Sequence, residues 1–248
     1  MSSPATPPVR LRLVLLPGMD GTEILFGPLL RALPAAIEPE VVTYPETGPN
    51  RYEDLLPAVI ERVRSGRDCI LLGWSFSGPL ALRVAVCCPD RVRGVILAAT
   101  FVTPPIRWLV SVRQLVRGPT FFALRVLRRL PIWLLRHRDD PLRRDKAAIW
   151  QRVPAHTLAA RARAILAVDV RDELRRCPCP VLYLAASDDR VVPPRNAAEV
   201  RAVRPAAETA TIAGGHFALY SAADAGAAAI GEFAVRCLAD RVAAATNP

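Results

Sequence analysis

A serine between small residues is the strongest chemical signal in this sequence. Ser75 lies in the segment Gly73-Trp74-Ser75-Phe76-Ser77-Gly78, after the apolar run 69–74 and before a helical pattern. A serine hydroxyl needs a base to take its proton, and a sharp strand-to-helix turn lifts it clear of a sheet when small residues lie two positions before and after it. Ser75 is therefore the candidate nucleophile. The alternative is an ordinary strand–helix loop that contains serines.

Three histidines could supply the base. His137 and His156 lie in a strongly basic segment, where solvent-facing polar side chains are expected. His216 differs because it follows a predicted strand and Gly214-Gly215, and it precedes Phe217 and a helical pattern. A double-glycine loop gives the imidazole freedom to reach over the ends of strands. We expect His216 to be the base, the alternative being a plain loop histidine.

A carboxylate is needed to hold the histidine in the required tautomer. Asp188 and Asp189 follow the apolar run 180–186, in Ser187-Asp188-Asp189-Arg190-Val191-Val192-Pro193. We predict Asp189 as the acid and keep Asp188 as the alternative. Both carboxylates could instead have a turn or helix-capping role.

Short apolar runs alternate with amphipathic segments along most of the chain. The sequence predicts strands at 10–16, 41–44, 69–74, 92–99, 180–186 and 208–212. The apolar runs 69–74, 92–99 and 180–186 are expected to be buried. Helical spacing predicts helices at 22–33, 51–65, 79–88, 195–203 and 221–244. This alternation predicts an α/β fold with a mostly parallel central sheet covered by helices on both faces.

The segment 103–172 interrupts the alternation. It is helical, rich in arginine and punctuated by prolines. We interpret it as a helical cap insertion over one end of the sheet. The expected domains are a core from 1–102, the cap from 103–172 and the second part of the core from 173–248.

Composition excludes several other classes of protein. Hydrophobic residues make up 52% of 248 residues, so a sizeable core can form. No apolar run reaches the ~18 residues of a membrane-spanning helix, and the polar, proline-rich 1–8 segment lacks a signal-peptide core, so a cytoplasmic location is expected. The six cysteines suggest no disulfide framework. Cys177 and Cys179 could be half of a metal site, but packing is the preferred interpretation because no second cluster accompanies them.

These motifs together resemble the α/β-hydrolase superfamily from Arg10 to about Ala244. The Ser75 turn, the segment Asp189–Pro193 and the loop Gly214–Phe217 look like those of small carboxylesterases of the pimeloyl-acyl-carrier-protein methyl esterase type. The chain order of serine, aspartate and histidine is that expected of this fold. The resemblance implies an α/β-hydrolase fold and a Ser75–His216–Asp189 triad.

The segment Leu15–Thr22 looks like the His-Gly oxyanion loop of that family, with Pro17 in place of the histidine. The resemblance implies that the backbone N–H groups of Met19 and Phe76 form the oxyanion hole, since two such donors stabilise a tetrahedral intermediate. The alternative is a glycine turn that joins a strand to a helix. Asp20 would repel an oxyanion, so we expect its carboxylate to point away and cap the helix near Thr22.

The excess of positive charge is confined to one part of the chain. Between Pro104 and Arg176 there are 17 basic and 6 acidic residues, whereas the rest holds 16 and 17. We expect an apolar face of this segment to cover the active site and its arginines to project outward, including Arg125, Arg128 and Arg129. The interpretations are a solvated arginine surface, docking of an acidic acyl carrier protein, or attachment to an anionic lipid surface. No recognised nucleic-acid motif accompanies the charge.

The function predicted from these features is hydrolysis of carboxylic esters through an acyl-enzyme, without a metal or organic cofactor. The substrate is expected to be a small acyl ester. Thioesterase or acyl-carrier-protein ester hydrolase activity is the nearest alternative, a cofactor-free perhydrolase is a more distant one, and a non-catalytic acyl binder is the alternative outside the enzymes. The candidate substrate-binding residues are Trp74, Phe101, Trp108 and Phe217.

Overall fold

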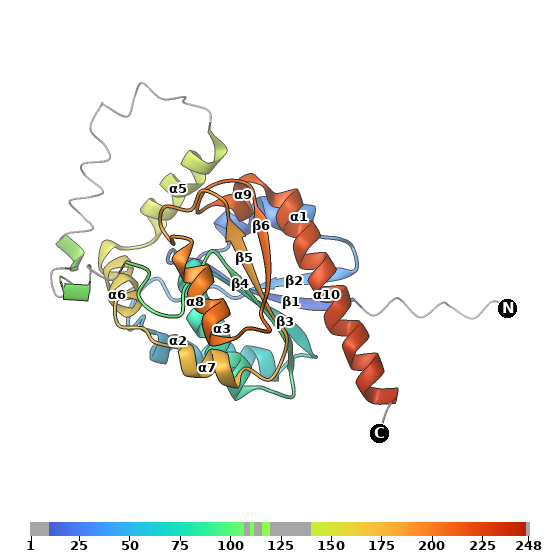
Figure 1. Ribbon diagram of the computed structural model, residues 1–248. Helices are drawn as coiled ribbons and strands as arrows, with labels where there is room; N and C mark the ends of the chain where they lie inside the picture. Colours follow the sequence, from blue (N-terminus) through green and yellow to red (C-terminus); the bar gives the residue numbers. More distant parts are fainter. Residues whose placement is uncertain (1–9, 107–109, 112–115, 120–139, 247–248) are drawn as a thin grey trace.

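A six-stranded sheet, all of whose strands are parallel, runs through the protein (Figure 1). The computed structural model describes residues 10–106, 110–111, 116–119 and 140–246. The strand order is β2-β1-β3-β4-β5-β6. The strands are β1 (Leu11–Leu16), β2 (Ile37–Val41), β3 (Cys69–Trp74), β4 (Val92–Ala98), β5 (Val181–Ala186) and β6 (Glu208–Ile212).

Helices cover both faces of the sheet, because alternate side chains of the central strands enter two separate apolar clusters. In β1, Val14 and Leu16 join one cluster, and Leu13 and Leu15 join the other. The first face carries α2 (Tyr52–Arg64), α3 (Gly78–Cys87), α7 (Arg171–Arg176) and α8 (Arg195–Val203). The second carries η1 (Ile24–Phe26), α1 (Gly27–Ala32), α9 (Ala218–Ser221) and α10 (Ala223–Thr246). The predicted α/β fold is confirmed.

The order of the strands determines where a ligand can bind. The chain passes from β1 outward to β2 and then returns to β3 on the other side of β1. The connections after β1 and β3 therefore diverge at the carboxyl ends of these strands. In open parallel sheets such a switch point is the usual ligand site. Residues 17–21 and the Ser75 turn lie there.

Two helices of the insertion pack on the core near this switch point: α5 (Pro141–Arg152) and α6 (Ala155–Ile165). Ile149 and Leu158 join the second apolar cluster. The Val170 amide donates to the Val102 carbonyl at 2.9 Å, so the chain leaves and re-enters the core at adjacent points. The boundaries of the predicted domains stay a prediction, and Arg125, Arg128 and Arg129 lie outside the described residues.

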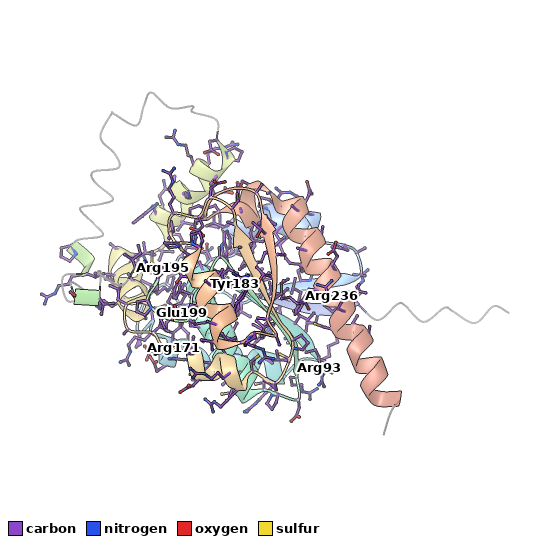
Figure 2. All side chains as sticks on the ribbon, viewed as in Figure 1. Arg93, Arg171, Tyr183, Arg195, Glu199 and Arg236 are labelled. Atoms are coloured by element: carbon purple, nitrogen blue, oxygen red, sulfur yellow. The ribbon has the colours of Figure 1, made fainter. Side chains whose placement is uncertain are left out.

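Helix α8 also secures the start of the insertion. Figure 2 labels Arg195 and Glu199 on this helix. Arg195 donates to the Pro105 carbonyl at 2.5 Å, and the Thr103 hydroxyl donates to Glu199 at 2.8 Å. Thr103 and Pro105 are thus tied to the helix layer on the first face of the core.

The second strand differs from its prediction. The sequence pattern placed it at 41–44, but β2 spans Ile37–Val41 and pairs with Leu11–Leu15. It is an edge strand, and edge strands tolerate Pro39 and charged side chains that point to solvent. The prediction was wrong because Glu38, Pro39 and Glu40 obscure the strand pattern.

Other element boundaries shift or break. The predicted helix 22–33 is a 3-10 turn followed by α1. The predicted helix 221–244 corresponds to α10, and a separate short helix, α9, precedes it and ends before Ala222, whose φ of −125° and ψ of 49° are not helical. Strands 69–74 and 208–212 and helix 195–203 are confirmed at both ends.

Cys177 and Cys179 are buried just before β5, at the opposite end of that strand from Asp189. In the part of the chain that is described, no helix has the length and apolarity required to cross a membrane.

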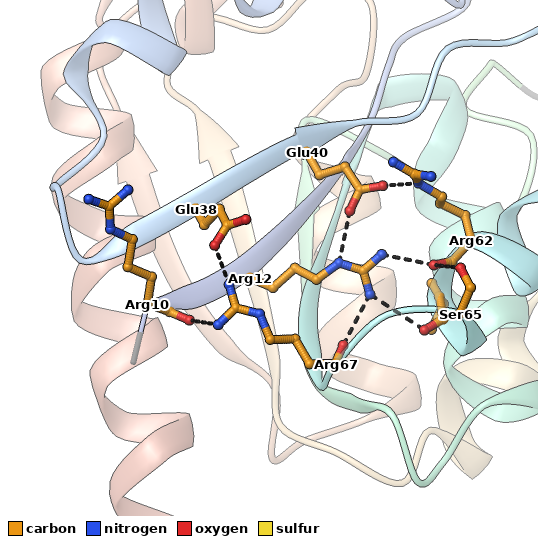
Figure 3. A network of polar contacts seen from close by, with 8 residues as sticks. Arg10, Arg12, Glu38, Glu40, Arg62, Ser65 and Arg67 are labelled. Carbon is orange, nitrogen blue, oxygen red and sulfur yellow. Dashed lines mark hydrogen bonds and ion pairs between the residues drawn. The ribbon is translucent and has the colours of Figure 1, made fainter. Parts of the chain in front are cut away.

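A buried arginine near the amino end of β1 joins β2 to the carboxyl end of helix α2 (Figure 3). Arg12 donates to Glu40 at 2.8 Å and to the carbonyls of Arg62 at 2.8 Å and Arg67 at 3.0 Å. Its cation satisfies carbonyl groups at the C-terminal end of the helix. Burial acts to raise the pKa of Glu40, but its bonds with Arg12 and Arg62 outweigh this and hold the pKa below its ordinary value.

Replacing Glu40 by glutamine should destabilise the protein at neutral pH. Arg12, whose side chain is 8% exposed, would lose its carboxylate, and we expect the free energy of unfolding at pH 7 to fall by about 1–3 kcal/mol. Because the folded-state pKa is depressed, this stabilisation is present above the unfolded pKa and is lost as the pH falls through the folded one. Urea unfolding at pH 7 and near pH 3 should show the difference between wild type and variant shrinking in acid.

Glu38→Gln is the matched control for this experiment. Glu38 lies on the same strand and pairs with Arg67, but its side chain is 54% exposed. Exposed ion pairs contribute about 0–1 kcal/mol. Equal losses in the two variants would contradict a special contribution from the Arg12 network.

Candidate active site

The candidate nucleophile lies on a sharp turn between β3 and α3. Ser75 has a φ of 52°, a left-handed conformation that is strained for a residue with a side chain. Two glycines permit the close packing of this turn. A Cβ atom on Gly73 would lie 2.5 Å from the Ser77 carbonyl oxygen, and one on Gly78 would lie 2.2 Å from Thr100 Oγ1.

Ser77, which departs from the usual glycine of this motif, has a defined place in the structure. It is fully buried, and its hydroxyl donates to the carbonyl of Pro17 at the end of β1. Since a carbonyl only accepts, the second bond of Ser77 Oγ, 2.6 Å long, is donated by the hydroxyl of Tyr44. Ser77 therefore links the nucleophile turn to the loop that follows β1.

A chain of hydrogen bonds connects Ser75, His216 and Asp189. Ser75 Oγ lies 2.9 Å from Nε2 of His216, and Nδ1 of His216 lies 2.8 Å from Oδ2 of Asp189. With the histidine proton on Nδ1, the ring donates to Asp189 and Nε2 is available to accept from the serine hydroxyl. The geometry is that of a nucleophile, a base and an orienting acid.

The structure also distinguishes the two adjacent aspartates. Asp189 is 7% exposed, and its second oxygen accepts from the amides of Val191 and Val192, each at 2.8 Å. Burial acts to raise the pKa of Asp189, but the bonds with His216 and these amides outweigh it and hold the pKa below its ordinary value. Asp188 is exposed, and its carboxylate accepts from the Ser187 hydroxyl at 2.7 Å instead.

The two predicted oxyanion donors follow β1 and β3 at the switch point. Among the described residues, the Met19 amide has no backbone acceptor. Phe76 is the second residue of η2 (Ser75–Ser77). The amides in the first turn of a helix have no acceptor within that helix. The Phe76 carbonyl accepts from the Tyr52 hydroxyl at 2.8 Å, which holds the next peptide, Phe76–Ser77, in place.

Asp20 bonds to Thr22 but does not cap a helix, because the first helical turn, η1, begins at Ile24 and its N-cap residue, Glu23, has no side-chain capping bond. Its carboxylate accepts from the Thr22 amide at 2.9 Å and from the Thr22 hydroxyl at 2.5 Å. Asp20 also forms part of the cavity wall beside Ser75. Burial raises its pKa, which disfavours a negative charge so close to a developing oxyanion.

A cavity of about 300 Å³ opens over the Ser75 and His216 side chains. Its walls are mostly apolar. The core contributes Leu25, Trp74, Phe101, Val191, Val192 and Phe217, and the cap helices contribute Lys146, Ile149, Trp150, Leu158 and Ile165. The cap therefore forms one side of the cavity.

Three of the four candidate substrate-binding residues, Trp74, Phe101 and Phe217, line this cavity. Trp108 lies outside the described residues. Sequence reasoning missed Lys146, whose Nζ lies 3.4 Å from the centre of the Phe217 ring, although it is the only lysine in the chain. It also missed Arg161, which shares the buried side of α6 with Leu158. The available signal was that Arg161 occupies a position in the helical spacing where an apolar residue is expected.

The chain belongs to the alpha/beta hydrolase family, whose sequence model matches residues 13–229. It is 26% identical over 224 residues to a protein of Stutzerimonas stutzeri (strain A1501) described as a candidate carbamate hydrolase, RutD, with 82% of this chain and 84% of that protein covered. The family and this hydrolase relative support a hydrolytic enzyme.

Solved structures show the same fold. MenH from S. aureus has a TM-score of 0.73 at 16% identity and covers 92% of this chain and 94% of its own. A carboxylesterase of the thaumarchaeon Nitrososphaera gargenis has a TM-score of 0.72 at 17% identity and covers 97% and 99%.

Proposed function

We propose that this protein is a serine hydrolase that cleaves carboxylic esters through an acyl-enzyme. The observation that carries the proposal is the continuous chain of hydrogen bonds from Ser75 through His216 to Asp189, at the floor of an apolar cavity. Hydrolysis uses a strained serine, an imidazole and a buried carboxylate together, whereas a pocket that only binds a ligand requires none of them.

In the first half-reaction, the Ser75 oxygen attacks the ester carbonyl and His216 Nε2 takes the hydroxyl proton. The carbonyl oxygen becomes negatively charged in the tetrahedral intermediate, and the Met19 and Phe76 amides donate to it. Asp189 stabilises the imidazolium that forms. When the intermediate collapses, His216 gives its proton to the departing alcohol and the acyl group remains on Ser75.

In the second half-reaction, water takes the place of the alcohol. His216 removes a proton from the water as it attacks the acyl-enzyme carbonyl, and the same two amides stabilise the second oxyanion. Collapse releases the carboxylic acid and returns the proton to Ser75 Oγ. All proton transfers use groups of this chain.

The cavity favours a compact substrate with an apolar acyl part. A volume of about 300 Å³ is at the lower end of small-molecule sites, which span roughly 300–1,000 Å³. Trp74, Phe101 and Phe217 would contact the acyl part. A thioester or a carbamate, the substrate class in the name of the Stutzerimonas stutzeri relative, presents a carbonyl to the same groups. The proposal also includes docking of an acidic acyl carrier protein at the arginine-rich cap.

Labelling with a fluorophosphonate probe tests the proposal directly. The wild-type protein should form one covalent adduct, located on Ser75 by mass spectrometry, and Ser75→Ala should not react. Ser65→Ala, which removes an exposed hydroxyl beyond the far end of the sheet, is the matched control and should react like wild type. Equal labelling of wild type and Ser75→Ala would refute a Ser75 nucleophile, and an unlabelled wild-type protein would favour a non-catalytic acyl binder.

A substrate panel then separates the possible reactions. p-Nitrophenyl esters and acyl thioesters of increasing chain length, together with one aryl carbamate, should be cleaved at rates that follow the fit of the acyl group. A higher kcat/KM for thioesters of equal chain length would replace the ester assignment with a thioesterase.

A further inference from the structure

Arg161 is a fully buried side chain of the cap helix α6, far along the sequence from the loop that it contacts. One of its terminal nitrogens, Nη1, donates to the carbonyls of Met19 at 3.0 Å and Asp20 at 2.6 Å. The other, Nη2, donates to the Pro45 carbonyl at 2.9 Å and to Asn50 Oδ1 at 2.8 Å, and Nε donates to Asn50 Oδ1 at 3.0 Å.

These acceptors are unusual for a buried cation. All of them are neutral carbonyl oxygens, and burial lowers the pKa of Arg161 to about 10. A buried charge is costly unless its surroundings replace the lost water. The planar fork of the guanidinium, rather than the charge itself, explains why an arginine fits here, because it binds several carbonyls in fixed directions.

The loop is shaped to receive this guanidinium. Gly21 has a φ of 71°, and a Cβ atom at that position would lie 2.4 Å from Arg161 Nη1. The Gly21 amide donates to the Gly18 carbonyl at 3.0 Å, which closes a tight turn over residues 18–21. The turn and the arginine therefore occupy complementary space.

The turn determines where the Met19 amide points. In a trans peptide the N–H lies opposite the carbonyl of the preceding residue. The Gly18 carbonyl faces into the turn, so the Met19 N–H faces out of it. Arg161 binds the Met19 and Asp20 carbonyls, which belong to the two peptides that follow the one carrying the Met19 N–H, so it braces the rest of the turn. The Tyr44 amide, which donates to the Gly21 carbonyl at 2.9 Å, holds the far end of the loop.

We propose that Arg161 is a positioning residue for the oxyanion hole, and that the hole is complete only when helix α6 of the cap is docked on the loop 17–21. The proposal rests on the proposed function, because it assigns the Met19 N–H to the oxyanion. Docking of the cap has further contacts at the same core segment: the Thr157 hydroxyl donates to the Glu46 carbonyl at 2.6 Å, and Arg152 pairs with Glu46.

Arg161→Met and Arg161→Lys test the proposal with a short-chain p-nitrophenyl ester. Loss of an oxyanion donor typically costs on the order of 10²- to 10³-fold in kcat, and we expect a loss of that size with KM changed less than about 3-fold. The lysine variant keeps the charge but cannot bridge the same carbonyls, so it should resemble the methionine variant. Arg163→Met is the control: Arg163 is exposed on the same helix and donates to the Val116 carbonyl, and kcat should be unchanged.

A transition-state analogue separates positioning from general damage. A trifluoromethyl ketone forms a tetrahedral oxyanion on Ser75, so its affinity should fall in parallel with kcat/KM, whereas the affinity of the product acid should hold. Guanidinium ion at millimolar concentration should restore part of kcat to Arg161→Ala but not to Arg161→Met. Thermal unfolding of each variant identifies those that are folded, and Arg161→Lys replaces Arg161→Met if the latter is not.

The proposal fails if a folded Arg161 variant keeps kcat within about 3-fold of wild type. It also fails if kcat falls while the affinity of the trifluoromethyl ketone does not. Failure of the proposed function has a different signature, since wild-type protein itself would then show no ester cleavage and no adduct on Ser75.

Discussion

His216→Ala should lower kcat for a reactive ester by about 10⁵- to 10⁶-fold. Without the imidazole, the Ser75 hydroxyl has no base at 2.9 Å to accept its proton, and the departing alcohol has no acid. Members of a triad act as a unit, so loss of the base alone costs nearly as much as loss of the whole triad. The measurement is steady-state kcat with a p-nitrophenyl ester, together with the rate of fluorophosphonate labelling, which should fall with it.

His156→Ala is the matched control for this prediction. His156 is exposed at the start of helix α6, and its removal should leave kcat and labelling within about 2-fold of wild type. If His216→Ala retained more than a few per cent of wild-type kcat, the imidazole would not be the base. A similar loss in both variants would indicate damage to the cap instead.

Asp189→Asn should lower kcat by about 10³- to 10⁴-fold. The Val191 and Val192 amides require an acceptor, so the asparagine turns its oxygen toward them and its NH2 group toward Nδ1 of His216. An NH2 group can only donate to Nδ1, which forces the histidine proton onto Nε2 and removes the acceptor that Ser75 needs. The variant also loses the negative charge that stabilises the imidazolium. The pH–rate profile of the residual activity should change as well, since hydroxide can replace the missing base and the rate should rise with pH.

Asp188→Asn distinguishes the two aspartates that the sequence left open. Its carboxylate is exposed and bonded to the Ser187 hydroxyl, so the substitution should change kcat by less than about 3-fold. The reverse result, with Asp188→Asn inactive and Asp189→Asn active, would move the acid of the triad by one residue and contradict the bonds of His216 described above.

Much of the core could be predicted because its strands are buried on both faces. Strand β3 is apolar over its whole length and was predicted to the residue. The edge strand β2 was misplaced because a strand with one side at the surface can contain Glu38, Pro39 and Glu40 without an apolar signal. The non-helical residue Ala222, which separates α9 from α10, leaves no signal in the local spacing of apolar residues.

The site shows the same division between local and long-range information. The small residues around Ser75 were visible in the sequence, but not which of them must lack a Cβ atom. Gly78 is required because Thr100, 22 residues away, lies against it, while Ser77 is tolerated because Pro17 and Tyr44 bind its hydroxyl. None of these partners is adjacent in sequence.

The sequence by itself determined the chemical types and their order along the chain: a serine in a tight turn, an aspartate after a strand and a histidine after two glycines. These depend on local backbone geometry, which a few neighbouring residues dictate. Only the tertiary structure decided that Asp189 rather than Asp188 meets the imidazole, and that Arg161 of the cap is buried against the loop after β1. Such contacts join segments more than 25 residues apart, and the packing of the whole core determines whether their atoms come within hydrogen-bond distance.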